Sequence, residues 1–268
     1  MMRFFRLREQ PTVVGRVLAG ALCLALIFGL WLFLTWGAIP EERIVSPAQL
    51  PSVSETAASF HSLWFDRALT RNVFASIQRV LMGFGLAILV GVPIGVICGT
   101  WPRINAFFAP LTVFGRNVPI SALVPLTLLW FGIEELQKVM FIFIACLAFV
   151  IFDTARAIAE VHDRYVQSAY TLGATNSQIV LKVLVPLALP EIFGSMRLLF
   201  GLAFGYIVLA EMVNQTSGMG ALILTSQRIG PKEHVFLVLF VITLVAYGID
   251  RMLLEVQRIL FPYRESDG

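Results

Sequence analysis

The amino-acid sequence predicts an all-α integral membrane protein with about six transmembrane helices. Hydrophobic residues make up 58% of its 268 residues and charged residues only 14%, with a mean hydropathy of +0.82. Soluble domains carry about 25% charged residues, so this composition is typical of a membrane protein. Several apolar runs also reach the length of about 20 residues that an α-helix needs to cross a bilayer. The net charge of +3 is small, and we expect no nucleic-acid partner.

The first span is predicted from an uncharged run between Val17 and Pro40, which four arginines precede. The run is longer than the apolar stretch of a secretory signal, which is about 7–15 residues. We therefore expect an uncleaved first span that follows a cytoplasmic segment, residues 1–16.

The segment 41–71 separates the first two spans and has a mixed composition. Ser54 could cap a short amphipathic helix that carries Phe60, Leu63 and Trp64 on one side. Such a helix is expected to lie at the outer membrane interface.

Five further apolar segments complete the expected transmembrane domain, residues 17–263. They are 80–102, 117–133 (with 107–115 leading into it), 136–157, 192–213 and 234–254. Six spans put both termini on one side, and residues 264–268 would form a cytoplasmic tail. This topology places 13 of the 20 Lys and Arg residues in the cytosol, in agreement with the positive-inside rule.

A polar segment, about residues 164–190, interrupts the apolar pattern between the fourth and fifth spans. Tyr165, Ala169 and Leu172 have the spacing of one helical face. Gly173 suits the left-handed conformation that ends a helix. The sequence therefore predicts a short helix that stops at this glycine.

A second short helix is predicted after the glycine. Either Thr175 or Asn176 can cap its start. Pro186 disfavours helix at the preceding residue, so the helix is expected to stop near Val185. From the residues alone, the pair could also be an amphipathic loop that rests on the membrane surface.

This segment resembles the cytoplasmic loop of the permeases of bacterial binding-protein-dependent ABC importers. The family pattern runs Glu-Ala-Ala, three residues, Gly, nine residues, Ile-x-Leu-Pro. The loop residues that correspond to it or flank its glycine are Gln167, Ser168, Ala169, Leu172, Gly173, Ala174 and Pro186. Two of them depart from the pattern, because Gln167 replaces the family glutamate and Ser168 the first alanine.

Landmarks over residues 72–263 resemble the permeases of the nitrate, sulfonate and taurine importers. They are Ser76-Ile77-Gln78-Arg79, Pro119, Pro125-Leu126, Trp130-Phe131-Gly132, Leu189-Pro190-Glu191-Ile192-Phe193, Ala210-Glu211-Met212 and Gly218-Met219-Gly220. The resemblance implies a type I ABC importer permease in the bacterial inner membrane, surrounded by lipid. It also implies that the loop is a coupling element that docks on a separate ATPase.

The resemblance further implies the partners of the chain. These are a dimer of ABC ATPase subunits, a periplasmic or lipid-anchored substrate-binding protein, and a second permease chain, with a homodimer expected. The sequence contains no G-x-x-x-x-G-K-[ST] phosphate loop, so a partner must hydrolyse ATP. Cysteines and histidines lack metal-site spacing, and we expect no catalytic residue, metal or cofactor in this chain.

The third predicted span contains residues that suit a translocation route. Pro119 and Pro125 remove backbone donors and are expected to bend it, and Asn117 and Ser121 add polar groups nearby. Glu211 is an ionisable residue in or near the fifth predicted span, so it is a second pathway candidate. Its alternative place is near the outer interface, where water hydrates a carboxylate.

Two glycine repeats indicate close helix packing, within one subunit or between subunits. Gly91, Gly95 and Gly99 recur in the second span, and Gly201 and Gly205 in the fifth.

The expected cargo is a small organic anion or oxyanion such as a sulfonate, taurine or nitrate. Alternatives are bicarbonate or a thiamine or riboflavin precursor. An ion-coupled secondary transporter is less favoured because no inverted repeat is found. An intramembrane enzyme is less favoured because protease and hydrolase motifs are absent.

Overall fold

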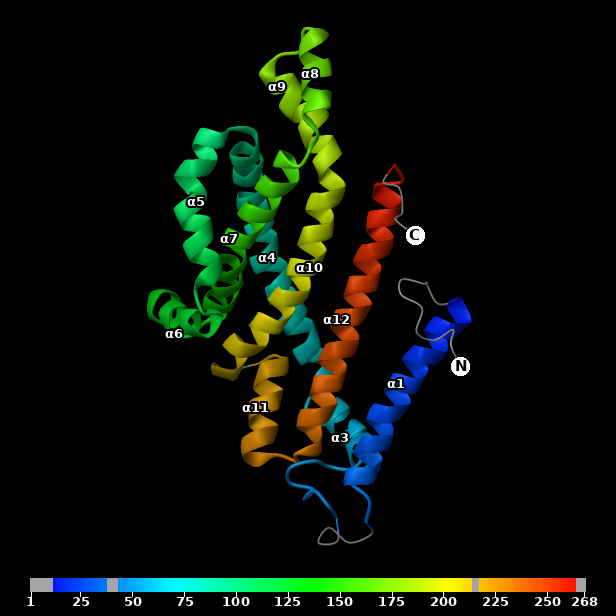
Figure 1. The fold of residues 1–268 in the computed structure, drawn as a ribbon. Coiled ribbons are helices and arrows are strands. Elements are labelled where there is room, and N and C mark those ends of the chain that lie inside the picture. Colours follow the sequence, from blue (N-terminus) through cyan, green and yellow to red (C-terminus); the bar gives the residue numbers. More distant parts are fainter. Residues whose placement is uncertain (1–11, 38–42, 214–216, 264–268) are drawn as a thin grey trace.

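The computed structural model describes residues 12–37, 43–213 and 217–263, and these residues form helices and connecting segments without a β-strand. In chain order the elements are α1 (Val13–Leu34), α2 (Val53–Ala58), α3 (Phe60–Phe65), α4 (Leu69–Thr100), α5 (Pro102–Asn117), α6 (Ile120–Phe131), α7 (Glu135–Ala159), α8 (Asp163–Thr171), α9 (Asn176–Ile179), the π-helix η3 (Val180–Leu184), α10 (Val185–Val213), α11 (Met219–Ile229) and α12 (Glu233–Leu260). Figure 1 shows a long bundle with α8 and α9 protruding at one end and α3 and α11 at the other. The all-α membrane fold predicted from the sequence is confirmed.

Five segments of the described chain are long and apolar enough to cross a membrane: α1, α4, α7, α12 and the continuous segment Asn176–Val213. The predicted third span is different, because the chain bends by 103° between α5 and α6. Proline explains the break. Val118 precedes Pro119 and has the extended conformation that a following proline favours, with φ −67° and ψ 127°. The bend that the sequence predicts is therefore a full change of direction, and α6 lies across the end of α5 (Figure 1).

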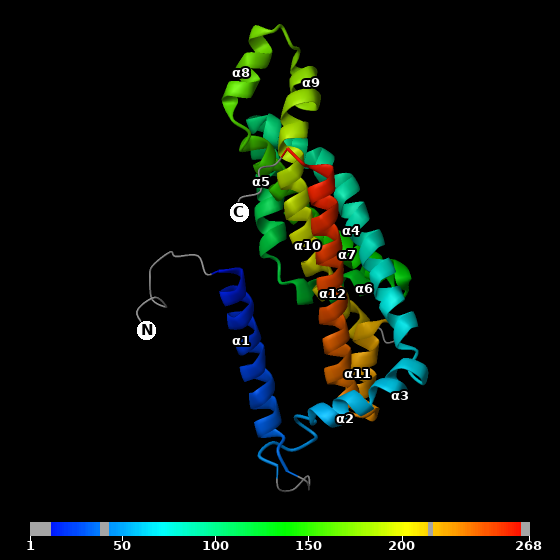
Figure 2. The same cartoon turned by 90° about the vertical axis from the view of Figure 1, so that its right-hand side faces the viewer.

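The first span stands apart from the bundle. None of the residues of α1 is buried, and Figures 1 and 2 both show it separated from α12. Its C-terminal end is held by the indole of Trp31, whose Nε1 donates to the carbonyl oxygen of Pro51 at 2.9 Å. The start of α1 and the end of α12 point toward the side on which α8 and α9 protrude (Figure 1).

The segment between α1 and α4 contains two short helices, and Ser52 rather than Ser54 caps the first. Ser52 Oγ accepts from the backbone N–H of Glu55, and the Glu55 carboxylate accepts from the N–H of Ser52. This reciprocal capping box needs an acidic or amide side chain three residues after the cap, which Ser52 has and Ser54 lacks. Arg43 also forms two hydrogen bonds to Glu55, at 2.9 and 3.0 Å.

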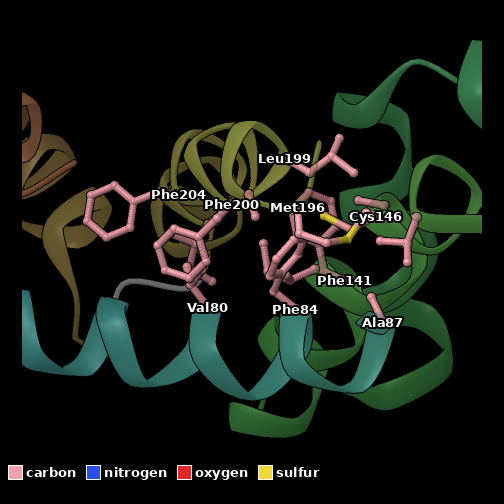
Figure 3. Close-up of a cluster of buried hydrophobic side chains, with 14 of the residues drawn as sticks. Val80, Phe84, Ala87, Phe141, Cys146, Met196, Leu199, Phe200 and Phe204 are labelled. Carbon is pink, nitrogen blue, oxygen red and sulfur yellow. The ribbon is translucent and has the colours of Figure 1, made fainter. Parts of the chain in front are cut away.

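The core lies between α4, α7 and α10, and glycines bring the first two of these helices together. A Cβ added at any of Gly83, Gly91, Gly95 or Gly99 would come within 2.7 Å of an atom of α7. The repeat in α4 therefore packs within one subunit. Figure 3 shows the cluster that fills the space, including Val80 and Phe84 from α4, Phe141 and Cys146 from α7, and Met196 and Phe200 from α10.

The predicted stop near Val185 is wrong, because the chain remains helical from Asn176 to Val213. The π-helix η3 precedes Pro186, and in it the N–H of Val185 donates to the carbonyl of Val180. This wider turn accommodates a proline within a helix. Pro190 cannot donate to the carbonyl of Pro186 four residues earlier, and the hydroxyl of Tyr263 donates to that carbonyl instead, at 3.1 Å.

Candidate functional site

The protruding loop begins with a helix that ends as predicted. Gly173 follows α8 with φ +77°, a conformation that glycine adopts without a steric penalty. The N–H of Gly173 donates to the carbonyl of Tyr170 at 2.9 Å, and the N–H of Ala174 donates to that of Ala169 at 3.0 Å. These two bonds form a Schellman motif, which satisfies the last carbonyls of the helix. The loop therefore turns at a defined point.

The second helix of the loop starts at a capping box, and the cap is Thr175. Its hydroxyl oxygen accepts from the N–H of Gln178 at 3.4 Å, and the Gln178 side chain accepts from the N–H of Thr175 at 2.9 Å. Asn176 instead joins the two helices, because its Oδ1 accepts from the Tyr170 hydroxyl at 2.9 Å. The two helices are thus fixed to each other by local hydrogen bonds.

The surface of this loop is largely exposed. The predicted apolar face is split, because Ala169 is buried whereas Tyr165 and Leu172 are exposed, Leu172 to 88%. Exposed apolar side chains at the tip of a protruding element suit contact with a partner protein. The other loop residues named from the sequence are also at the surface: Gln167, Ser168, Gly173 and Pro186 are exposed, and Ala174 is half-buried.

A buried ion cluster lies in the opposite half of the bundle, centred on Arg79 of α4. The Nε and Nη2 atoms of Arg79 donate to the two carboxylate oxygens of Glu135 at 2.6 and 2.7 Å. Its Nη1 donates to Glu211 at 2.7 Å and to the carbonyl of Ser217 at 2.9 Å, and its Nη2 also donates to the Ser217 hydroxyl. Five hydrogen bonds therefore use the full donor set of this guanidinium.

Glu211 of α10 is fully buried in this cluster, so the hydrated place near the outer interface, the alternative predicted for it, is not present, whereas its role in the pathway stays a prediction. Its carboxylate accepts from the hydroxyl of Ser76 at 2.7 and 2.9 Å and from the N–H of Gly220 at 3.0 Å. A carboxylate at the start of α11 is stabilised by the unpaired N–H groups there. Four hydrogen bonds from three residues, Ser76, Arg79 and Gly220, thus hold the Glu211 carboxylate, which is closed to solvent in the single chain.

Glycine is required beside this carboxylate. Gly218 has φ +109°, and a Cβ on it would overlap the Glu211 carboxylate. The N–H of Gly218 donates to Asn72 Oδ1 at 2.7 Å, and that of Met219 donates to Ser76 Oγ at 3.0 Å. Two stretches that are distant in sequence, one around Ser76 and the other from Glu211 to Gly220, therefore meet at one point.

Sequence reasoning did not identify Arg79 and Glu135 as a pair. Arg79 and Glu135 each lie in or next to an apolar run, and a charged residue in such a place is usually paired when it is buried. This could have indicated that each of them has a partner. The partner itself was not predictable, because Arg79 and Glu135 are separated by α5 and α6.

The other pathway candidates lie on or next to the bent α5–α6 pair. Asn117, Pro119, Ser121 and Pro125 are all exposed to the outside of the single chain. The amide of Asn117 donates to the carbonyl of Val113 at 2.7 Å. The side chains of these four residues are thus open in the single chain, whereas Glu211 is enclosed against α4.

Comparisons with known proteins agree with this architecture. Residues 91–254 match the family described as "Binding-protein-dependent transport system inner membrane component". The chain is 27% identical over 237 residues to the taurine transport system permease protein of Escherichia coli, covering 87% of this chain and 86% of the relative. It is 26% identical over 249 residues to the nitrate import permease protein of Synechococcus elongatus, covering 90% and 88%. The inward-facing methionine ABC transporter MetNI superposes with a TM-score of 0.67 at 21% identity, covering 75% of this chain and 98% of that chain.

Proposed function

The chain belongs to the inner membrane components of binding-protein-dependent transport systems, and we propose that it carries a small organic anion or oxyanion. It is a multi-pass permease subunit of an ABC importer, and its family works with an ATPase and a substrate-binding protein. A sulfonate, taurine or nitrate is the proposed cargo, because the relatives named above are taurine and nitrate permeases. Bicarbonate is the alternative anion, since a relative is a bicarbonate transport system permease protein.

The observation that carries the coupling role is the form of the α8–α9 loop. It protrudes beyond the bundle in both views, and its turn is fixed by a Schellman motif and a capping box (Figures 1 and 2). A rigid projection with an exposed Leu172 suits insertion into a groove on the ATPase. In this proposal the loop faces the cytosol, as do both termini, and the ATPase rather than this chain hydrolyses ATP.

A homodimer is proposed from the outer face of α10. Leu198, Gly201, Leu202, Gly205 and Leu209 are exposed and follow one helical face. No atom lies within 4 Å of a Cβ added at Gly201 or Gly205, in contrast to the glycines of α4. Small residues at this spacing let two membrane helices pack closely, and here no helix of the same chain packs on them. The α10 helix of a second copy could occupy this face.

Reconstitution tests the proposal. The chain, its ATPase and its binding protein are placed in proteoliposomes, and ATP-dependent uptake of taurine, methanesulfonate and nitrate is measured. Uptake of at least one anion that stops when the ATPase is inactivated is expected. Uptake driven by an ion gradient without ATP, or uptake restricted to thiamine or riboflavin precursors, would contradict it.

A matched pair of variants tests the coupling loop. Leu172→Asp places a charge on the proposed contact, so uptake and association with the ATPase should fall by about tenfold or more. Ile229→Asp makes the same change at another exposed apolar residue, 82% exposed, at the end of α11. It should leave ATPase association unchanged. Equal behaviour of the two variants would argue against docking at Leu172.

A further inference from the structure

The ion cluster borders a cavity with several polar residues in its wall. The cavity has a volume of about 740 Å³ and lies between the first half of α4 and the start of α7. Its polar lining comes from Arg71, Gln78, Arg79, Glu135 and Ser217. Small-molecule sites usually have volumes of about 300–1,000 Å³, so a small anion has ample room here.

The two carboxylates that pair with Arg79 differ in exposure. The side chain of Glu211 is fully buried, whereas that of Glu135 is 61% exposed and lines the cavity. Glu211 is also held by Ser76 and Gly220, so it cannot leave without breaking the start of α11. Only Glu135 can move away from Arg79 into open space.

The edge of Arg79 that Glu135 occupies is suited to oxyanions in general. Its Nε and Nη2 bind both oxygens of the carboxylate in parallel, at 2.6 and 2.7 Å. A guanidinium binds carboxylate, phosphate and similar oxyanions through the same pair of donors. Arg71 and Gln78 line the same cavity and supply further donors at its wall.

We propose that Glu135 is an internal counterion that occupies an oxyanion site on Arg79, and that a small oxyanion solute replaces it during transport. This inference rests on the proposed function, in which the cargo is a small anion. On replacement the solute binds Nε and Nη2, and Glu135 turns into the cavity while keeping Lys138 Nζ, now 3.2 Å away, as a partner. Arg79 is then never left with a single carboxylate, which would be costly in a buried site.

Competition has a functional consequence. A solute that must displace Glu135 binds weakly, and a transport site needs weak binding so that the solute can leave. Removing the competing carboxylate should therefore strengthen anion binding rather than abolish it. This sign separates the proposal from a purely structural ion pair.

The test compares Glu135→Ala with Glu134→Ala in the purified permease–ATPase complex, without binding protein, in nanodiscs. Glu134 is the adjacent exposed carboxylate, so both variants remove the same charge near the start of α7. Sodium methanesulfonate is the probe, sodium gluconate keeps ionic strength constant, and thermal stability reports binding. Half-maximal stabilisation of Glu135→Ala should need about tenfold less methanesulfonate than the wild type or Glu134→Ala.

Two outcomes overturn the proposal: Glu135→Ala and Glu134→Ala respond equally, or Glu135→Ala responds more weakly than the wild type. If Glu135→Ala does not fold, Glu135→Gln replaces it and should also respond at lower concentration, because a neutral amide competes less well. Uptake by the wild-type importer tests the cargo separately. Uptake of anions without a difference between the variants rejects only the counterion, whereas absence of anion uptake rejects the proposed cargo.

Discussion

Replacing Gly95 with alanine tests whether α4 and α7 depend on a side-chain-free contact. A Cβ on Gly95 would lie 2.5 Å from Thr154 Cβ and 2.8 Å from the carbonyl oxygen of Ile151. Carbon atoms in contact are normally about 3.5–4.0 Å apart. One of the two obstacles is backbone, so the helices themselves must separate by about 1 Å to restore normal contact distances.

Gly85 on the same helix provides the control and sets the magnitude. No atom lies within 4 Å of a Cβ added there. Alanine raises helix propensity by up to about 1 kcal/mol at either residue, so the difference between the variants isolates packing. Overpacking costs about 1–3 kcal/mol, and Gly95→Ala should be less stable than Gly85→Ala by that amount.

Unfolding of the purified permease in mixed micelles with increasing SDS, followed by circular dichroism, measures the two free energies of unfolding. ATP-dependent uptake by the same variants shows whether the separation of α4 and α7 also affects transport. Equal free energies of unfolding for Gly95→Ala and Gly85→Ala would refute the close approach of these helices.

Three further perturbations have defined outcomes. Glu211→Gln removes one charge of a buried ion pair with Arg79 and should cost about 3–5 kcal/mol of stability, measured by thermal unfolding; a loss below about 1 kcal/mol would contradict the burial. Thr175→Ala removes the cap of α9, worth about 1 kcal/mol, and should lower uptake per ATP hydrolysed, whereas Thr175→Ser should not; equal ratios would show that the cap is dispensable. Hydrogen bonds from Arg43 lower the pKa of Glu55 from 4.5 to about 2, so the tie between them contributes fully above pH 4.5 and is lost as the pH falls toward 2. A spin label in this segment should gain mobility over that range, and constant mobility would exclude the tie.

Local signals in the sequence were sufficient to predict the turn and the helix cap of the α8–α9 loop. Gly173 and Thr175 act on backbone groups within six residues of themselves, so their roles follow from short-range rules. The uncharged runs likewise predicted where the straight spans lie, although helix ends differ because polar first and last turns extend beyond the apolar part. The sharp angle at Pro119 exceeded the expected bend, since a proline rule gives a break but no direction.

Long-range contacts were the part that the sequence could not provide. Pro186 does not stop its helix because η3 widens the backbone just before it. The carbonyl that Pro190 leaves unpaired is satisfied by the hydroxyl of Tyr263, which is remote in sequence. Glu211 acquires its role from Ser76 and Arg79, more than a hundred residues earlier. The hydrophobic pattern of a single segment cannot predict contacts between residues so far apart in the sequence.

The unbroken helix from Asn176 to Val213 joins the two ends of the molecule mechanically. Its 38 residues span about 57 Å at 1.5 Å per residue, with the α8–α9 loop at one end and Glu211 near the other. Because one continuous helix connects them, a tilt of the loop would also move the ion cluster. The π-helix η3 beside the loop is wound differently from the α-helix that follows it, so a change that stiffens or loosens this turn would alter how far a movement of the loop is transmitted.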